Sequence, residues 1–570
     1  MFSLRQLSET SEELGSLKTW YVYLNPPQEE IDSSPLFTIR LILVLSTLMI
    51  SITLGGQPFL SSRPALETKS EPVPFTGTSP YDVVPTTLGH LPGIAADVIS
   101  DLTGKGFIVT YPGASNYTTA SQPYNFRYAY KPAVITYPTT IDQVSQIVKV
   151  AKADGYNVVA RSGGHSYVAN SLGGKDGSIV IDMQNFKTIT YDSSTKTAVI
   201  GVGNRLGNII TTLGGQGRAL PHGTSYGGYG FTSRMWGLAL DSVISADVVL
   251  ANGTIAKASK TQNPDLFFAI RGAAGSFGIV TSTQVQTYAA PSSATIFNYN
   301  YNLNINAAAT ALANFQTYAM SNVPAQLGLE IVLSKGSTRG TVNFGVVGGW
   351  YGAANQLNAT LQPFLGPLGN PSWEKVTPGS YLDSAKNLAG GSLDTSNPLG
   401  QHDTFYAKSL VTPQSSPMSQ TALKAFATYI SNNGYDASVP WFLQIELLGG
   451  SNSAINAVAS ADTAFAHRNS LFTMQLYAYS SDSNPPFPAD GFIFIDGVAD
   501  SIVKNSPANW DYGAYQPYIE DRLANSEFLY YKTNLPKLKT LKAQFDPTGV
   551  FNSPTGIKLK DRQNSFVHLH

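Results

Sequence analysis

Arg161-Ser162-Gly163-Gly164-His165-Ser166-Tyr167 follows an apolar run, residues 157–160, that we predict to be a short buried strand. The two glycines let the backbone turn tightly and present N–H groups with no side chain in the way, which is the arrangement that binds an anionic phosphate. His165 comes directly after the turn, where its ring can reach whatever the backbone holds. An isolated Gly-Gly-His is also typical of an ordinary strand-to-loop turn with a surface histidine, so the rest of the sequence is needed to choose.

The composition limits the class of protein. A chain of 570 residues predicts two domains or more. Lys and Arg total 36 against 37 Asp and Glu, and this formal net charge of −1 gives no electrostatic basis for binding nucleic acid or an anionic membrane surface. Charged residues are only 13% of the chain, which is about half of the usual share. A surface of uncharged polar residues and tyrosine suits a neutral, polyhydroxylated ligand and an extracellular location.

The chain contains no cysteine. Disulfides, thiolate nucleophiles and cysteine-ligated zinc or iron–sulfur centres are therefore excluded, and we predict no metal site. Sequons at Asn116, Asn252 and Asn358 permit N-glycosylation.

Residues 41–54 are almost wholly apolar or small, with Arg40 before them and Gly55-Gly56 after them. This length is typical of a signal-peptide core and is shorter than the roughly 20 residues that span a bilayer. The acidic stretch ahead of the segment is unusually long for a signal sequence. Two alternatives explain it: an uncleaved membrane anchor through residues 36–54, or a true translation start further downstream. We predict secretion.

A strand-and-helix pattern begins after residue 88. Residues 133–137 predict a strand, and the apolar spacing from residue 141 to 151 predicts a helix capped by Thr139-Thr140 and ended by Gly155. Asn252-Gly253 predicts the turn of a hairpin. The other elements expected in this block are strands at 157–161, 178–183 and 197–202, a short helix near Asn204, the hairpin strands 243–250 and 254–258, and the segments 265–270 and 277–287.

The pattern changes near residue 290. Longer alternating strands are expected at 327–333, 342–350 and 441–448, with helices at 353–365 and 454–468. This combination predicts an antiparallel sheet with helices on one face, an α+β layer. The tail, residues 520–545, is expected to be helical.

An ordered set of motifs makes the sequence recognisable. It resembles the FAD-linked oxidases of the berberine-bridge-enzyme and glucooligosaccharide-oxidase type over roughly residues 90–560. The motifs are the seven residues Arg161 to Tyr167, Gly237-Leu238-Ala239-Leu240-Asp241, the stretch from Ala246 to Gly253, the stretch from Asn263 to Gly272, the stretch from Gly275 to Val280, the segment Tyr515 to Tyr518, and Asp546-Pro547-Thr548-Gly549-Val550-Phe551.

The resemblance implies a two-domain FAD-binding fold of the PCMH type. We divide the chain into an N-terminal extension (1–56), a linker rich in Pro, Ser and Thr (57–88), a FAD-binding domain (89–290), a substrate domain (291–505) and a C-terminal segment that returns to the FAD-binding domain (506–570).

The resemblance also implies a cofactor site at the opening motif. The Gly163-Gly164 backbone would cradle the FAD pyrophosphate, and His165 would bond covalently to the 8-methyl carbon of the flavin, which keeps the cofactor from being lost. A second close approach to FAD is expected between Gly272 and Gly278, although a glycine loop packed against a strand explains the same residues. The full set of expected cofactor-binding residues is Arg161, Ser162, Gly163, Gly164, His165, Ser166, His222, Gly223, Gly228, Gly275, Gly278, Ile279 and Val280.

In oligosaccharide oxidases of this type, a tyrosine of the C-terminal region deprotonates the sugar hydroxyl. The matching residue is Tyr518, with Tyr515 beside it and Pro517 in place of the usual asparagine. A phenol with a pKa of about 10 needs a hydrogen-bond partner or a nearby positive group to act as a base at neutral pH. The alternative is two packed core tyrosines in a tyrosine-rich chain. Tyr167 is expected to line the substrate site.

Gln444 and Glu446 alternate with apolar residues on one predicted strand and therefore share a face. They are candidate substrate residues, and solvated positions on a sheet are the alternative.

The largest departure from the family pattern lies between Pro221 and Gly230. Sugar-oxidising relatives carry a cysteine after the His-Gly-Thr sequence that forms a second bond to flavin, whereas here Thr224 runs directly into Ser225. Either the protein has truly lost this segment, leaving flavin attached through His165 alone or an inactive flavoprotein, or an exon boundary is misplaced.

We therefore predict a FAD-dependent oxidase of a sugar or oligosaccharide hydroxyl, with O2 as the acceptor and H2O2 as the product. Two alternatives stay open: an oxidase or oxidative cyclase of a secondary metabolite, and a glycan-binding protein that kept the fold and lost redox function.

Overall fold

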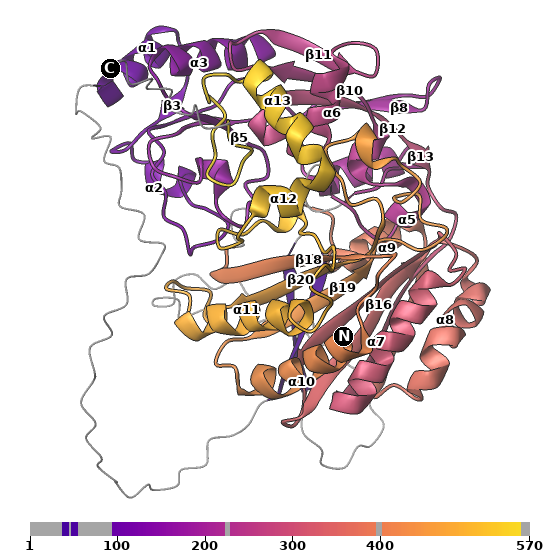
Figure 1. Cartoon of the computed structure of the whole chain (residues 1–570). Coiled ribbons are helices and arrows are strands. Elements are labelled where there is room, and N and C mark those ends of the chain that lie inside the picture. The colour runs from indigo at the N-terminus through magenta and orange to yellow at the C-terminus, as the bar shows by residue number, and fades with distance from the viewer. Residues whose placement is uncertain (1–36, 45–46, 55–93, 223–227, 395–401, 560–570) are drawn as a thin grey trace, which may run out of the picture.

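The computed structural model describes residues 37–44, 47–54, 94–222, 228–394 and 402–559, and it shows two stacked units (Figure 1). The upper unit in Figure 1 combines a four-stranded sheet, a five-stranded sheet and helices. The lower unit is a seven-stranded antiparallel sheet with helices on one face. The predicted α+β class, with an antiparallel sheet and one helical face in the second unit, is confirmed.

The four-stranded sheet has the order β3-β4-β6-β5, in which β4, β6 and β5 run parallel. Between β4 and β5 the chain forms α3, and Thr140 caps this helix by accepting a hydrogen bond from the Gln143 backbone N–H. The predicted stop is confirmed, because Gly155 has a φ of 75° just after the helix end. The bounds in this region are α1 (Ile94–Gly104), β3 (Val109–Thr110), α2 (Tyr117–Ala120), β4 (Val134–Thr136), α3 (Ile141–Ala153), β5 (Val158–Arg161) and β6 (Ile179–Asp182).

The five-stranded sheet has the order β11-β10-β12-β8-β7. Its hairpin turns at Asn252-Gly253 as expected, and Gly253 takes a φ of 78° there. The bounds are β7 (Ile189–Asp192), β8 (Thr197–Gly201), α4 (Leu206–Gly214), β9 (Arg218–Ala219), α5 (Ser233–Trp236), β10 (Val243–Val249), β11 (Ile255–Ser259), α6 (Pro264–Ala273), β12 (Ile279–Gln286) and β13 (Tyr288–Ala289).

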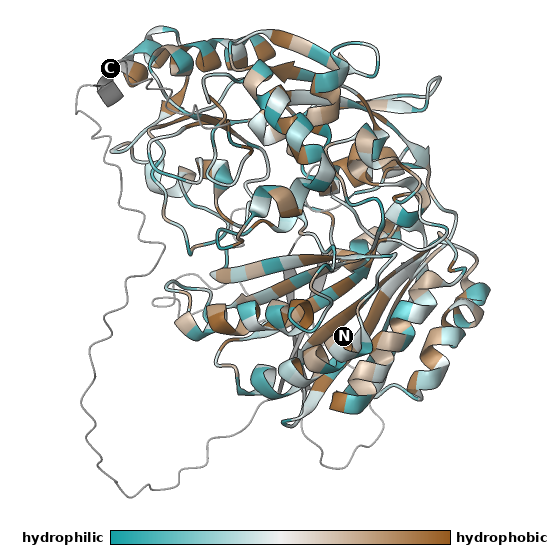
Figure 2. Ribbon diagram, viewed as in Figure 1, coloured by the Kyte–Doolittle hydropathy of each residue, from teal (hydrophilic) through white to brown (hydrophobic). Residues whose placement is uncertain are grey.

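The seven-stranded sheet has the order β17-β14-β16-β15-β19-β20-β18. Helices α7, α8, α10 and α11 cover one face, and Figure 2 shows hydrophobic residues concentrated along the strands beneath them. The bounds are β14 (Ala294–Asn304), α7 (Ile305–Met320), β15 (Leu327–Lys335), β16 (Thr341–Trp350), α8 (Leu357–Leu365), β17 (Trp373–Gly379), α9 (Tyr381–Leu388), β18 (Phe405–Pro413), α10 (Gln420–Asp436), β19 (Trp441–Leu447), β20 (Ser470–Tyr479) and α11 (Ala489–Val503).

The opposite face of this sheet packs against the upper unit. Phe405, Phe442 and Tyr477 on the strands share one buried cluster with Tyr124 and Tyr167 of the upper unit. The side chains that β18, β19 and β20 present on this inner face are therefore buried between the two units.

Two sequence predictions need correction, and one segment takes a form that the sequence did not address. The helix expected at 454–468 is wrong, because this segment forms turns and one short 3-10 turn at Ser460–Asp462. The tail is helical only in part, as α12 (Ser526–Tyr531) and α13 (Leu535–Phe545), and Glu520 to Asn525 lie outside any helix. The apolar segment near the N-terminus forms the antiparallel hairpin β1 (Phe37–Val44) and β2 (Thr47–Leu54), whereas secretion stays a prediction.

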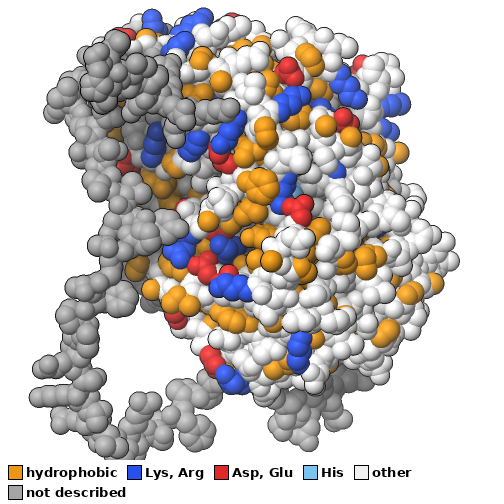
Figure 3. All heavy atoms as spheres, viewed as in Figure 1, with side chains coloured by type: hydrophobic (Ala, Val, Ile, Leu, Met, Phe, Trp, Pro, Cys, Tyr) orange, Lys and Arg blue, Asp and Glu red, His pale blue; other side chains and the backbone are white. Residues whose placement is uncertain are grey.

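Among the described residues, no helix combines the length and the hydropathy that crossing a bilayer requires. Figure 3 shows a face on which Lys and Arg are scattered and interspersed with Asp and Glu. This distribution accords with the small net charge of the chain.

The C-terminal part of the chain returns to the upper unit, where α13 lies beside α6 (Figure 1). Lys542 of α13 is buried, and its ammonium group donates to the Asp546 carboxylate at 2.6 Å and to the carbonyls of Ser276 and Phe551 at 2.8 Å. Asp546 in turn accepts the backbone N–H groups of Val550 and Phe551. Lys542 therefore joins the last helix to the segment before β12 through its hydrogen bond to Ser276, while Asp546 compensates its charge.

We expect Lys542→Met to lower the free energy of unfolding by about 3–5 kcal/mol, because it leaves the buried Asp546 carboxylate without its cation. Chemical denaturation followed by circular dichroism measures this loss. The matched control is Lys537→Met on the same helix, whose half-exposed partner Asp265 lies 3.3 Å away; an exposed pair of this kind contributes about 0–1 kcal/mol. Equal effects of the two substitutions would contradict the assignment.

Candidate active site

The predicted phosphate turn follows β5 directly, and its side chains are engaged within the protein. Arg161 forms an ion pair with Asp182 at 2.6 Å and donates to the Ala120 carbonyl at 2.5 Å. The Ser162 hydroxyl donates to the Val202 carbonyl, and the Ser166 hydroxyl accepts the Asn170 N–H. These side chains fix the shape of the turn.

The backbone of the turn is open. Among the described residues, the N–H groups of Gly163, Gly164 and His165 have no hydrogen-bond partner. Gly164 takes a φ of 72°, and a Cβ atom at either glycine would meet only the side chains of Arg205 or Arg161, at 3.6 Å or more. Free N–H groups on a turn with space before it fit the phosphates of a dinucleotide, so the residues present suit FAD.

His165 lies next to the aromatic residues of the inner face. Its ring stacks on Tyr124 with centroids 3.9 Å apart. Burial, followed by the positive charge of Arg205, lowers the pKa of His165 to about 4. The imidazole is therefore neutral at physiological pH, which is the form in which a ring nitrogen is nucleophilic.

The second predicted glycine segment divides into two parts. A Cβ at Gly278 would lie 2.6 Å from Val248 of β10, so this glycine is required for packing against a strand. A Cβ added at Gly275 would meet nothing within 4 Å, so the surroundings of this glycine are open to a bound group. Ile279 is buried and Val280 half-buried at the start of β12.

Of the third predicted segment, Gly223 lies outside the described residues, as do Thr224 and Ser225. His222 is half-buried, and burial lowers its pKa to about 4. Gly228 is buried, and its carbonyl accepts the Ala239 N–H.

The predicted catalytic tyrosines come together on the inner face. The rings of Tyr167 and Tyr518 stack at 5.9 Å, with only 9° between their planes. Tyr515 meets the Tyr518 ring edge-on at 5.2 Å. The Tyr167 ring lies 6.4 Å from Tyr124, which stacks on His165. A continuous row of rings thus connects the predicted flavin-linking histidine to the predicted base.

Glu446 of β19 is the centre of the polar contacts. The Tyr518 hydroxyl donates to Glu446 Oε1 at 3.0 Å, and the Tyr229 hydroxyl donates to Oε2. Burial raises the pKa of Glu446 to about 7, against the opposing effect of these two hydrogen bonds. Burial and then the Glu446 carboxylate raise the pKa of Tyr518 well above its usual range. The hydrogen-bond partner of Tyr518, the predicted base, is therefore a carboxylate.

A second carboxyl group lies across the strand pair from the first. Glu330 of β15 is the register partner of Glu446. Burial and the neighbouring Glu446 charge raise the pKa of Glu330 well above its usual range. Two buried carboxyl groups this close do not both ionise near neutral pH, so Glu330 is the protonated member of the pair.

Several acceptor atoms beside the tyrosines have no hydrogen-bond partner within the described residues. They are Gln444 Oε1, Gln475 Oε1, Glu330 Oε1 and the Tyr515 hydroxyl oxygen. An unpaired buried polar atom costs about 1–3 kcal/mol, so such a group is a place to expect a donor from a ligand. Gln475 uses its amide nitrogen to donate to the Tyr167 hydroxyl at 2.6 Å.

Four residues of this constellation were not predicted from the sequence: Tyr124, Tyr229, Glu330 and Gln475. Tyr229 lies in the segment between Pro221 and Gly230 where the sequence departs from the family pattern. Gln475 stands in an otherwise largely apolar strand, which is the kind of signal that selected Gln444. The strand that contains Gln475 was itself not predicted.

Two family models match this chain. The FAD binding domain matches residues 132–259, and the berberine and berberine-like model matches residues 514–558. Each match contains part of the site, since the first includes the turn at Gly163 and the second includes Tyr515 and Tyr518.

The chain is 34% identical over 464 residues to a chitooligosaccharide oxidase of Gibberella zeae, covering 79% of this chain and 92% of the relative. It is 34% identical over 475 residues to a xylooligosaccharide oxidase of Thermothelomyces thermophilus, again covering 79% and 92%. A solved glucooligosaccharide oxidase from Acremonium strictum, described with a 6-S-cysteinyl, 8α-N1-histidyl FAD, superimposes with a TM-score of 0.74 at 29% identity, covering 81% of this chain and 99% of its own. The chain belongs to the berberine-bridge-enzyme-like family of FAD-linked oxidoreductases, and FAD is its cofactor.

Proposed function

We propose that this enzyme oxidises a hydroxyl group of an oligosaccharide at its reducing end, with O2 as the electron acceptor and H2O2 as the product. The observation that carries the proposal is the Tyr518–Glu446 pair, which lies beside buried amide and carboxyl acceptors without partners among the described residues. Acceptors of this kind pair with the many hydroxyl donors of a neutral sugar. The names of the relatives, a chitooligosaccharide oxidase and a xylooligosaccharide oxidase, support the same substrate class.

Tyr518 and Glu446 form a proton relay in this proposal. A free tyrosinate is disfavoured, because burial and the neighbouring carboxylate both raise the pKa of Tyr518. The phenol therefore takes the proton of the sugar hydroxyl while it passes its own proton to Glu446. Tyr229 holds the other carboxylate oxygen in place. When bound, FAD supplies the acceptor for the hydride that leaves the sugar carbon.

The turn at Gly163 and Gly164 binds the pyrophosphate in this proposal, and His165 Nδ1 or Nε2 forms the covalent bond to flavin. The free N–H groups of the turn and the neutral imidazole support both roles. Tyr167, Gln444 and Gln475 contact the sugar. We also propose the domain limits at residues 89, 291 and 506, and secretion of the protein.

We expect the purified enzyme to release H2O2 from at least one member of a panel of cello-, xylo- and chitooligosaccharides, in a peroxidase-coupled assay. Tyr518→Phe should lower kcat by about 10²–10⁴-fold, the usual contribution of a general base. Tyr531→Phe, a buried tyrosine of α12, is the control for loss of a hydroxyl. Peroxide formed from secondary-metabolite alcohols and from none of the sugars would contradict the substrate class.

Through the charge of Glu446, the free energy of unfolding should depend on pH, and the direction follows from the raised pKa of this group. Its pKa in the folded protein, about 7, lies above the unfolded value, so burying the group is without penalty below about pH 4 and most costly above pH 7. We expect Glu446→Gln to be up to about 3 kcal/mol more stable than the wild type at pH 8, since one pKa unit is worth about 1.4 kcal/mol, and equally stable near pH 4. Urea denaturation at the two pH values measures the difference.

The same variant should lose turnover at every pH, and turnover of the wild type should fall as the pH drops through 7 and Glu446 gains a proton. If the residual turnover of the variant still fell as the pH drops through 7, a group other than Glu446 would control this decrease.

His165→Ala should abolish covalently bound flavin. The measurement is the absorbance near 450 nm that stays with the protein after denaturation in acid and washing. The control is His402→Ala, because His402 stacks on Phe126 at 4.4 Å and lies outside the turn. Flavin retained by the His165 variant would show that the covalent anchor is a different residue.

A further inference from the structure

The residues that precede and follow Tyr518 are held by a single strand. We call residues 515–520 the tyrosine loop. This loop passes around β18, which is the edge strand of the seven-stranded sheet. At its start the Tyr515 N–H donates to the Ser409 hydroxyl at 2.9 Å. At its end the Lys408 ammonium group contacts Glu520 at 2.8 Å.

Lys408 and Ser409 are consecutive on the strand, so their side chains point to opposite faces of the sheet. Ser409 belongs to the inner face, where Tyr515 and Tyr518 lie. Lys408 belongs to the face covered by α11, where it also contacts Asp496 of that helix at 3.3 Å. The tyrosine loop is therefore clamped from both sides of the sheet edge by two neighbouring residues.

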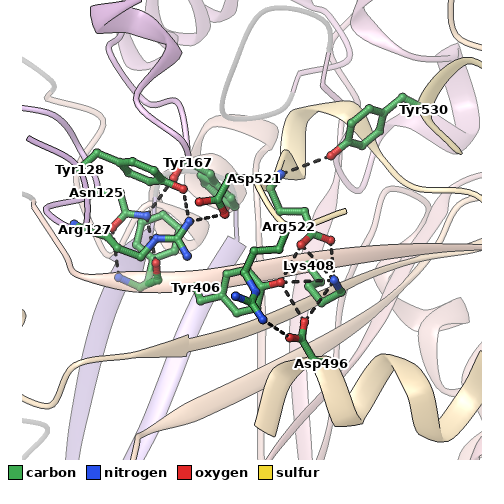
Figure 4. Close-up of polar contacts among 12 residues, drawn as sticks. Asn125, Arg127, Tyr128, Tyr167, Tyr406, Lys408, Asp496, Asp521, Arg522 and Tyr530 are labelled. Carbon is green, nitrogen blue, oxygen red and sulfur yellow. Dashed lines mark hydrogen bonds and ion pairs between the residues drawn. The ribbon is translucent and has the colours of Figure 1, made fainter. Parts of the chain in front are cut away.

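Lys408, Tyr406 and Tyr530, which are labelled in Figure 4, all form hydrogen bonds with the buried residue Glu520. Glu520 is 2% exposed, and its Oε2 accepts hydrogen bonds from Lys408 at 3.0 Å and from the Tyr406 hydroxyl at 2.6 Å. Its backbone N–H donates to the Tyr530 hydroxyl at 3.3 Å. Both the side chain and the backbone of Glu520 are thus fixed.

Figure 4 also shows the rim of this network. Arg522 pairs with Asp496 at 3.0 Å, and Arg127 pairs with Asp521 at 2.6 Å. The side chains of Arg522 and Asp521 are 49% and 40% exposed, so these pairs contribute little. Arg127 is itself only 11% exposed, but its partner Asp521 lies at the surface beyond the tyrosine loop. In the Lys408–Glu520 pair both side chains are buried, at 13% and 1% exposed.

The distance from the clamp to the base is short. Glu520 is two residues beyond Tyr518, and two residues of extended chain span at most about 7 Å. Ile519 between them is extended, with φ −63° and ψ 140°. A displacement of Glu520 therefore also displaces Tyr518. The hydrogen bond from Tyr518 to Glu446 depends on the position of the Tyr518 ring.

We propose that Lys408 is a positioning residue for Tyr518: its ion pair with Glu520 fixes the tyrosine loop so that the phenol reaches both Glu446 and the substrate hydroxyl. The inference rests on the proposed function. A buried ion pair adds little net stability over an apolar pair of the same volume, so its contribution here is the fixed geometry of the loop. Lys408 touches neither substrate nor cofactor and acts only through Tyr518.

The test compares Lys408→Met and the double variant Lys408→Met/Glu520→Gln with the wild type. We expect kcat on an oligosaccharide to fall by about a hundredfold in each variant, the effect of a displacement of about 1 Å at a reacting group. KM and the amount of covalent flavin should stay at wild-type values, since the sugar contacts and the turn at Gly163 are untouched. The double variant leaves no unpaired charge in the interior, so it carries the test if the single variant does not fold.

The control is Lys504→Met on α11, whose lysine is 72% exposed and pairs with Asp500 on the surface. It should keep the wild-type kcat. Recovery of wild-type kcat in the double variant would overturn the proposal, because it would show that the single substitution acts only by leaving a charge unpaired.

A crystal structure of the double variant separates this inference from the proposed function. A Tyr518 hydroxyl displaced from Glu446 supports the clamp even if the wild type oxidises no sugar, an outcome that would refute the function alone. A Tyr518 hydroxyl that keeps its hydrogen bond to Glu446, in a variant as active as the wild type, would refute the clamp and leave the function standing.

Discussion

The hydrogen bonds that Glu446 accepts from Tyr518 and Tyr229 are the interactions on which the site depends. They bring together three parts of the chain: a strand of the lower sheet, the C-terminal tyrosine loop and the segment that precedes α5. A carboxylate in this position is unfavourable by itself, because burial raises its pKa to about 7 and Glu330 stands opposite on the neighbouring strand. Burying this carboxylate lowers the stability of the folded protein, but it provides a group that can take up a proton near neutral pH, as perturbed carboxylates in enzyme sites do.

The local signals in the sequence were sufficient for much of the upper unit. Thr140 and Gly155 marked the ends of α3, and Asn252-Gly253 marked the hairpin of β10 and β11, because each of these features acts on its own backbone. The lower sheet was harder. β18 and β20 were not predicted, since their residues are buried on both faces and show no alternation. The segment 454–468, wrongly predicted as a helix, is rich in Ala, and its last residue, Arg468, is held by an ion pair with the distant Asp241.

The sequence predicted those site residues that belong to a local motif or to the pattern of a single strand. Tyr518 and His165 came from motifs, and Glu446 came from the alternation along its strand. Tyr229 and Glu330 could not be found in this way, because their roles come from contacts across 217 and 116 positions of sequence, which only the folded chain supplies. The turn at Gly163 is a second case in which the sequence identified the segment but not which of its atoms are available to a ligand. Its motif was correctly singled out, yet Arg161, Ser162 and Ser166 use their side chains to hold the loop, so the groups left to meet phosphate are in the backbone.

The contact between Lys542 and Ser276 joins residues 266 positions apart. The upper unit therefore cannot close while the chain is still being synthesised, because its last helix is made after the entire lower sheet. Pairings of such long range make folding slow and leave intermediates exposed. An unfinished chain therefore presents an incomplete upper unit, and α13 docks only after the full chain has been made.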